Sequence, residues 1–163
     1  LVKVQVLVDG DGGTTSVWRG CLRSGGRYLR FADGYEDFKG GEALSGFELA
    51  GRYAAFRRSN YSYSSGGSLS AGVVDLRTGE DVLSMGVADD REPRTLQELT
   101  VSTRGQLGLV LRDGQEDLIR VARPGGSSPR ELDRGPAGAI TGLAIVGGVA
   151  RWRNNGAERF AAL

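Results

Sequence analysis

The sequence predicts an all-β protein, and three observations lead to this fold class. Apolar and polar residues alternate along most of the chain, turn-forming residues separate the alternating segments, and helical periodicity is nearly absent. Glycine makes up 27 of the 163 residues without a collagen-like period, which indicates many tight turns. The best helical candidate, 90–99, contains Pro93 and few apolar positions. A chain of this length, 39% apolar, is expected to form a single domain, 1–163, with a substantial core.

The expected strands follow one another from the first residue. The chain opens with LVKVQVLV (1–8), in which Lys3 and Gln5 alternate with apolar residues as in a half-buried strand. Turn signals such as Asp113-Gly114 and Gly147-Gly148 bound the later segments. Those segments are 17–23, 28–32, 47–50, 53–57, 71–77, 81–85, 107–112, 118–123, 129–132, 140–146, 149–153 and 159–163.

Two sequence elements repeat along the chain. FELAGRYAAFR (47–57) aligns without a gap with LAIVGGVARWR (143–153), and a third copy begins at Leu99. The alignment places Phe56 and Trp152 at one position, where both are expected in the core. A strand followed by Arg and a tight turn recurs in phase at 22–25, 76–79 and 122–125. Four-stranded units with a period of about 40 to 50 residues are typical of β-propeller blades.

The repeats predict how the domain is divided. The expected units are 16–45, 46–95, 96–136 and 137–163, with 1–9 as an extra N-terminal strand. Strands from the two ends of the chain are expected to combine into one composite blade. That arrangement makes three blades, about half a ring, which a second copy (a homodimer) or a complementary chain would complete. A four-bladed monomer is the alternative if the ends form their own blades, and a β-sandwich is the alternative fold.

Four short segments carry a resemblance to a known group of proteins. LAGRY (49–53), VVDLRTG (73–79), CLRSGGR (21–27) and VARWRNNG (149–156) resemble blades of uncharacterised actinobacterial propeller-like proteins. The closing segment is also similar to the final blade of TolB-type propellers. The resemblance covers 16–163 and implies a propeller architecture and an extracellular or cell-surface setting. It carries over no catalytic residues.

Composition excludes several classes of function. The balance of 21 basic and 20 acidic residues, net +1, creates no field that would attract nucleic acid, although Arg57-Arg58 and Arg151–Arg153 are locally basic. No apolar run of 18 residues would span a membrane. The absence of histidine excludes His-based triads and most transition-metal sites. The single cysteine, Cys21, forms no internal disulfide and is expected to be a buried, inert thiol. No P-loop or Gly-x-Ser-x-Gly motif occurs, and no cofactor is expected.

The segment NYSYSSGGS (60–68) is the strongest candidate for ligand binding. Tyrosines separated by small polar residues provide amphipathic contact area at low entropic cost. We expect Asn60, Tyr61 and Tyr63 to lie in a long loop between the second and third strands of a unit. There they would present a stacking surface to a protein or carbohydrate. The alternative interpretation is a glycine-serine loop whose tyrosines pack locally.

Acidic residues form the second set of candidates. Asp9 and Asp11 lie two residues apart in a glycine loop, as at the start of a calcium site, but a plain hairpin turn fits the same residues. The segment 89–92 and the pairs 36–37 and 116–117 contain adjacent carboxylates of the kind that glycosidases use in pairs. The sequence therefore predicts a non-enzymatic binding or assembly module. The alternatives are a carboxylate-based hydrolase such as a glycosidase, and a structural subunit of an extracellular surface assembly.

Overall fold

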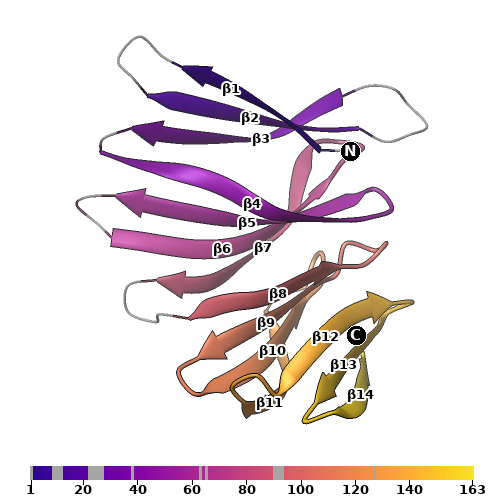
Figure 1. Ribbon diagram of the computed structural model, residues 1–163. Coiled ribbons are helices and arrows are strands. Elements are labelled where there is room, and N and C mark those ends of the chain that lie inside the picture. Colours follow the sequence, from indigo (N-terminus) through magenta and orange to yellow (C-terminus); the bar gives the residue numbers. More distant parts are fainter. Residues whose placement is uncertain are drawn as a thin grey trace.

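Antiparallel strands make up most of the computed structural model (Figure 1), which confirms the all-β fold. The structure describes residues 2–8, 13–21, 28–37, 39–62, 64, 66–89, 94–126 and 128–163, and no residue within these ranges is helical. The strands are β1 (Val2–Val8), β2 (Thr14–Cys21), β3 (Tyr28–Asp37), β4 (Gly40–Ala50), β5 (Tyr53–Ser62), β6 (Gly66–Asp75), β7 (Glu80–Asp89), β8 (Thr95–Val101), β9 (Leu107–Asp113), β10 (Glu116–Ala122), β11 (Arg130–Pro136), β12 (Ile140–Val146), β13 (Val149–Asn154) and β14 (Ala157–Ala162).

The strands form three sheets arranged in four layers. Strands β1 to β7 make one sheet, β8 to β11 a second, and β12 to β14 a third. Only two residue pairs join β3 to β4, Glu36 with Gly41 and Asp37 with Gly40, so the first sheet folds back there. The Trp18 ring of β2 consequently packs on Phe47 of β4, with ring centroids 4.4 Å apart. Figure 1 shows the layers following one another from β1–β3 to β12–β14.

Burial along the strands reflects this stacking. The two middle layers are covered on both faces, so residues 53–56 of β5 and 107–111 of β9 are buried without interruption. One core joins β4–β7 to β8–β11 through Ala55, Val73, Leu109 and their neighbours. A second core joins β8–β11 to β12–β14. Strand β13 instead alternates buried with exposed residues because only one face of the last layer is covered.

The three aligned segments occupy equivalent hairpins. Each forms the turn between the first and second strands of a layer: β4–β5, β8–β9 and β12–β13. The aligned turn glycines Gly51, Gly105 and Gly147 have φ values of +60°, +77° and +61°, a region that glycine adopts without strain. Phe56 and Trp152 are 0% and 5% exposed, so their predicted place in the core is confirmed.

The structure differs from the sequence-based expectation in three places. Residues 60–62 and 66–68 lie in strands β5 and β6, so the expected long loop is only the tip of a hairpin. Residues 95–99 of the helical candidate belong to strand β8. The ends of the chain form no composite blade: β1 pairs with β2, and β12–β14 form a sheet at the opposite end of the molecule (Figure 1). Local hairpins close at little entropic cost, which favours these pairings.

Candidate functional site

The predicted tyrosine site is not assembled as expected. Asn60 and Tyr61 are consecutive residues of β5, so their side chains point to opposite faces of the sheet. The Tyr61 hydroxyl donates a hydrogen bond to Glu36 Oε1 at 3.1 Å. The Tyr61 ring covers Gly41, where an added Cβ would lie 3.2 Å from Tyr61 Cε1. Tyr63 lies outside the described residues. Tyr61 is thus held by Glu36 but stays 42% exposed, so its role in ligand binding remains a prediction.

The predicted acidic candidates separate into those that the structure describes and those that it does not. Asp9, Asp11 and 90–92 lie outside the described residues. Within the described ranges, no three carboxylate or cysteine side chains gather as metal ligands would. Glu116 pairs with Arg134 at 2.8 Å, and the adjacent Asp117 is 1% exposed and accepts a bidentate hydrogen bond from Arg112. These two carboxylates therefore stabilise the fold.

The structure instead brings polar residues together where the first strands of three layers meet. Strands β4, β8 and β12 contact one another in sequence. A groove of about 500 Å³ lies at this junction. Its walls are Gly46, Phe47 and Glu48 of β4, Arg57 of β5, Leu96, Gln97, Glu98 and Leu99 of β8, and Gly142 and Leu143 of β12.

Bulges in these strands shape the groove. The pairing register shifts between Ser45 and Glu48 in β4 and between Thr141 and Ala144 in β12. Each bulge contains a glycine with positive φ, Gly46 at +60° and Gly142 at +67°. A bulge bends its strand and exposes backbone groups that the ladder leaves unpaired. Two such groups, the N–H of Gly142 and of Leu143, donate to the Glu98 carboxylate at 3.0 and 2.8 Å.

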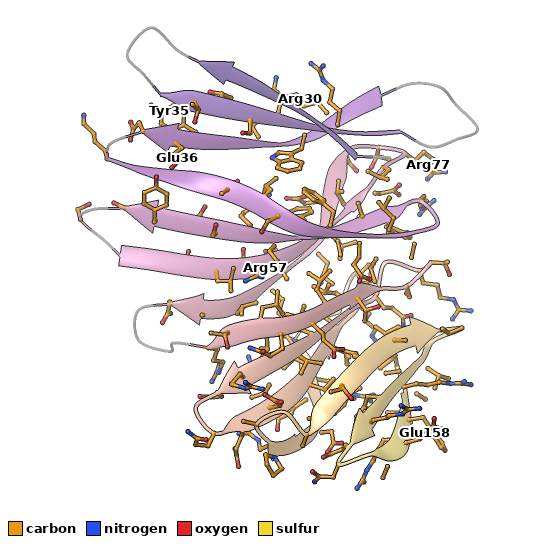
Figure 2. The ribbon with its side chains drawn as sticks, in the orientation of Figure 1. Arg30, Tyr35, Glu36, Arg57, Arg77 and Glu158 are labelled. Carbon is orange, nitrogen blue, oxygen red and sulfur yellow. The ribbon has the colours of Figure 1, made fainter. Side chains whose placement is uncertain are left out.

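Two charged side chains in the groove are open to a ligand. Within the described part of the chain, neither Arg57 (Figure 2) nor Glu48 forms an ion pair. The Arg57 stem lies over Gly46, where a Cβ would come within 2.9 Å of Arg57 Cδ. Partial burial, together with the nearby negative charge of Glu98, raises the pKa of Glu48 above its usual value. The groove therefore offers a cationic donor, an amide and two carboxylates with different surroundings.

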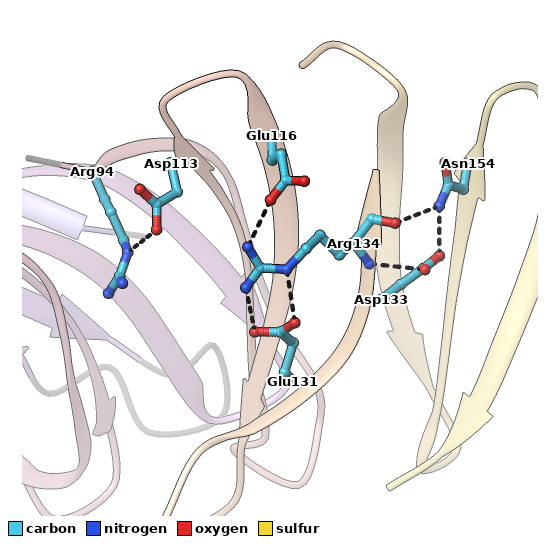
Figure 3. Close-up of polar contacts among 7 residues, drawn as sticks. All are labelled: Arg94, Asp113, Glu116, Glu131, Asp133, Arg134 and Asn154. Carbon is cyan, nitrogen blue, oxygen red and sulfur yellow. Dashed lines mark hydrogen bonds and ion pairs between the residues drawn. The ribbon is translucent and has the colours of Figure 1, made fainter. Parts of the chain in front are cut away.

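A separate polar network joins the last two layers (Figure 3). Asp133 of β11 accepts hydrogen bonds from Trp152 Nε1 at 2.6 Å, Asn154 Nδ2 at 2.9 Å and the Arg134 N–H at 2.8 Å. Burial alone would raise the pKa of Asp133, but these hydrogen bonds outweigh it and lower the pKa. The Asp133 carboxylate accepts three hydrogen bonds from within the protein, and Trp152 and Asn154 are buried, so we assign the network to stability rather than to ligand binding.

Sequence reasoning singled out Arg57 only as part of a basic cluster, and it missed Glu48, Gln97 and Glu98. One signal was available: Gly46 and Gly142 occupy the same position in the repeat alignment. A repeated glycine inside a strand pattern indicates a bulge, and bulges are frequent beside functional sites.

Comparison of the sequence with models of protein families and with curated proteins finds no match. Within the described ranges, no helix has the length and apolar character that crossing a membrane requires.

Proposed function

We propose that this chain is a non-enzymatic carbohydrate-binding module, built from propeller-like units, whose ligand binds in the groove between β4, β8 and β12. One observation carries the proposal. The first strands of three layers converge on a polar groove, and within the described part of the chain the Arg57 and Glu48 side chains in that groove form no ion pair. The proposal includes the extracellular setting that the resemblance implies.

The arrangement of the strands supports the propeller-like part of the proposal. Layers β4–β7 and β8–β11 are four-stranded meanders in chain order, as propeller blades are. The sequence elements that repeat fall on equivalent hairpins of successive layers. The first strands of neighbouring layers contact one another, as the strands that line the central channel of a propeller do.

The chemistry of the groove supports a ligand rich in hydroxyl groups. A hydroxyl both donates and accepts, so it satisfies a carboxylate, an amide and a guanidinium at once. Glu48 and Glu98 supply acceptors, Arg57 supplies donors, and Gln97 supplies both. Adjacent hydroxyls of a sugar ring match the planar geometry of these groups, whereas an apolar ligand would leave them desolvated and unpaired.

Isothermal titration calorimetry with a panel of neutral hexasaccharides tests the proposal. The probes are β-1,4-glucan, β-1,3-glucan, β-mannan and β-galactan oligomers. We expect one of them to bind, and the variants Glu48→Gln and Arg57→Ala to weaken its binding at least tenfold. Glu80→Gln, at an exposed position where β7 begins, is the matched control. Failure of all four oligomers to bind, or equal affinity of Glu48→Gln and Glu80→Gln, would overturn the proposal.

A second candidate function, a glycosidase, is favoured by one observation. Partial burial, and to a smaller extent the charge of Glu98, raises the pKa of Glu48, and a carboxylic acid with a raised pKa beside a second carboxylate is the pattern of a general acid and its partner. Release of reducing ends from the bound hexasaccharide distinguishes the two functions. Binding without release supports the binding module. Release that Glu48→Gln abolishes and Glu80→Gln preserves would establish the hydrolase instead.

A further inference from the structure

The outer face of the last layer is a second charged surface, and the hollow on it shares Gly142 with the groove. Strand β13 directs Ala150, Trp152 and Asn154 toward β8–β11, where all three are buried. Arg151 and Arg153 therefore point to the opposite face, which is exposed. A hollow of about 750 Å³ lies against this sheet. Arg151, Arg153, Glu158 and Phe160 are among its lining residues.

Cross-strand pairing gives this surface an ordered pattern. Arg151 lies opposite Phe160 of β14, a residue that is 79% exposed. Arg153 lies opposite Glu158, and Arg153 Nη2 is 3.5 Å from Glu158 Oε1. Arg151 and Arg153 are about 7 Å apart along the strand, from the rise per residue of a β-strand. Within the described ranges Arg151 forms no ion pair, so its guanidinium is available to an anion.

We propose that this face binds an acidic polysaccharide, a chain of uronate sugars, across Arg151, Arg153 and Phe160. Arg151 and Arg153 against the single Glu158 leave this face positive, and a guanidinium binds a carboxylate through two parallel hydrogen bonds. Phe160 offers a flat apolar surface to the apolar face of a sugar ring. Because the inference rests on different residues from the groove, it stands or fails independently of the proposed function.

The presence of Glu158 favours a uronate chain over a nucleic acid. A carboxylate needs donors, which the hydroxyls of a uronate supply and the phosphodiesters of DNA do not. Binding to a phosphate backbone also depends on many basic contacts, whereas this face carries only Arg151 and Arg153 and the whole chain has a net charge of +1. Alternating carboxylates and hydroxyls match the mixture of arginine and glutamate on this surface.

Calorimetric titration with an alginate hexasaccharide tests the inference, with mannan hexasaccharide as the neutral counterpart and a (dT)12 oligonucleotide as the competing polyanion. We expect alginate to bind, its affinity to fall at least fivefold between 50 and 500 mM NaCl, and both other probes to bind at least tenfold more weakly. The double variant Arg151→Ala/Arg153→Ala is expected to weaken alginate binding at least tenfold, and Phe160→Ala at least threefold. Arg77→Ala, in the exposed β6–β7 turn, is the matched control (Figure 2).

Several outcomes would overturn the inference. These are no binding of alginate, equal affinity of the double variant and Arg77→Ala, or tighter binding of (dT)12 than of alginate. Light scattering supplies a further test, since a dimer that dissociates in Phe160→Asp would place a second copy on this face. Arg151→Gln, which removes one exposed charge and retains a polar side chain, repeats the test if the double variant fails to fold. It is expected to weaken alginate binding at least threefold, and no effect would overturn the inference.

Discussion

Substituting Asp133 with alanine is expected to weaken the contact between the last two layers more than any loss of a surface ion pair. The Asp133 carboxylate accepts hydrogen bonds from Trp152 Nε1 and Asn154 Nδ2, side chains that are 5% and 8% exposed. Removing it leaves the Trp152 N–H and one of the two Asn154 amide N–H groups without an acceptor, whereas Asn154 Nδ2 keeps its hydrogen bond to the Arg134 carbonyl at 3.3 Å. Each unpaired buried donor costs about 1–3 kcal/mol. Because water reaches the enlarged site in part, we expect the free energy of unfolding to fall by about 2–4 kcal/mol.

Asp113→Ala is the matched control for this prediction (Figure 3). The Asp113→Ala variant also removes a charged hydrogen bond, the one that Arg94 Nε donates to Asp113 at 2.9 Å. The Asp113 side chain, however, is 44% exposed. Exposed ion pairs contribute about 0–1 kcal/mol, so this variant should lose less than about 1 kcal/mol. Urea unfolding followed by far-UV circular dichroism measures both free energies. Losses that agree within about 0.5 kcal/mol would refute the reasoning that burial decides the cost.

Two further predictions concern acid stability and the core. Burial opposes ionisation of Asp117, but hydrogen bonds from Arg112 and the Gly138 N–H outweigh it and lower the pKa of Asp117. The contribution of the ionised Asp117 to the free energy of unfolding is therefore complete above the unfolded pKa of about 3.9 and is lost as the pH falls below that value. Urea midpoints measured from pH 7 to 3 should consequently decline more steeply in the natural chain than in Asp117→Asn. Phe56→Ala should reduce the free energy of unfolding by about 3–5 kcal/mol, because Phe56 is fully buried, and a urea-measured loss below 1 kcal/mol would contradict that placement.

The strand content could be predicted from the sequence because it depends on local pattern. Residues 107–112 and 140–146 alternate or run apolar between turn glycines, and both are strands in the structure. Gly-Ser segments such as 66–68 could not be assigned in this way, since they have few side chains to bury, yet their backbone groups continue the β5–β6 ladder.

The candidate site could be predicted only in part. Tyrosine spacing suggested a binding loop at 60–68, but the hydrogen bond from Tyr61 to Glu36 depends on a strand that lies far away in sequence. The polar groove was missed for the same reason. Glu48 and Glu98 come together because β4 and β8 belong to layers that pack side by side, which no local pattern records.

The sequence by itself determined the all-β class and the positions of the turns, since each follows from the residues within a few positions along the chain. It also determined the burial of Phe56 and Trp152, because the two residues align in the internal repeat. Tertiary structure decided which strands share a sheet, how the layers stack, and which polar side chains lack a partner. Stacking covers both faces of β9 but one face of β13, so Val110 is buried while Arg151 remains exposed. The physical reason is that burial and charge pairing depend on neighbours across layers, whereas alternation and turn formation depend on neighbours along the strand.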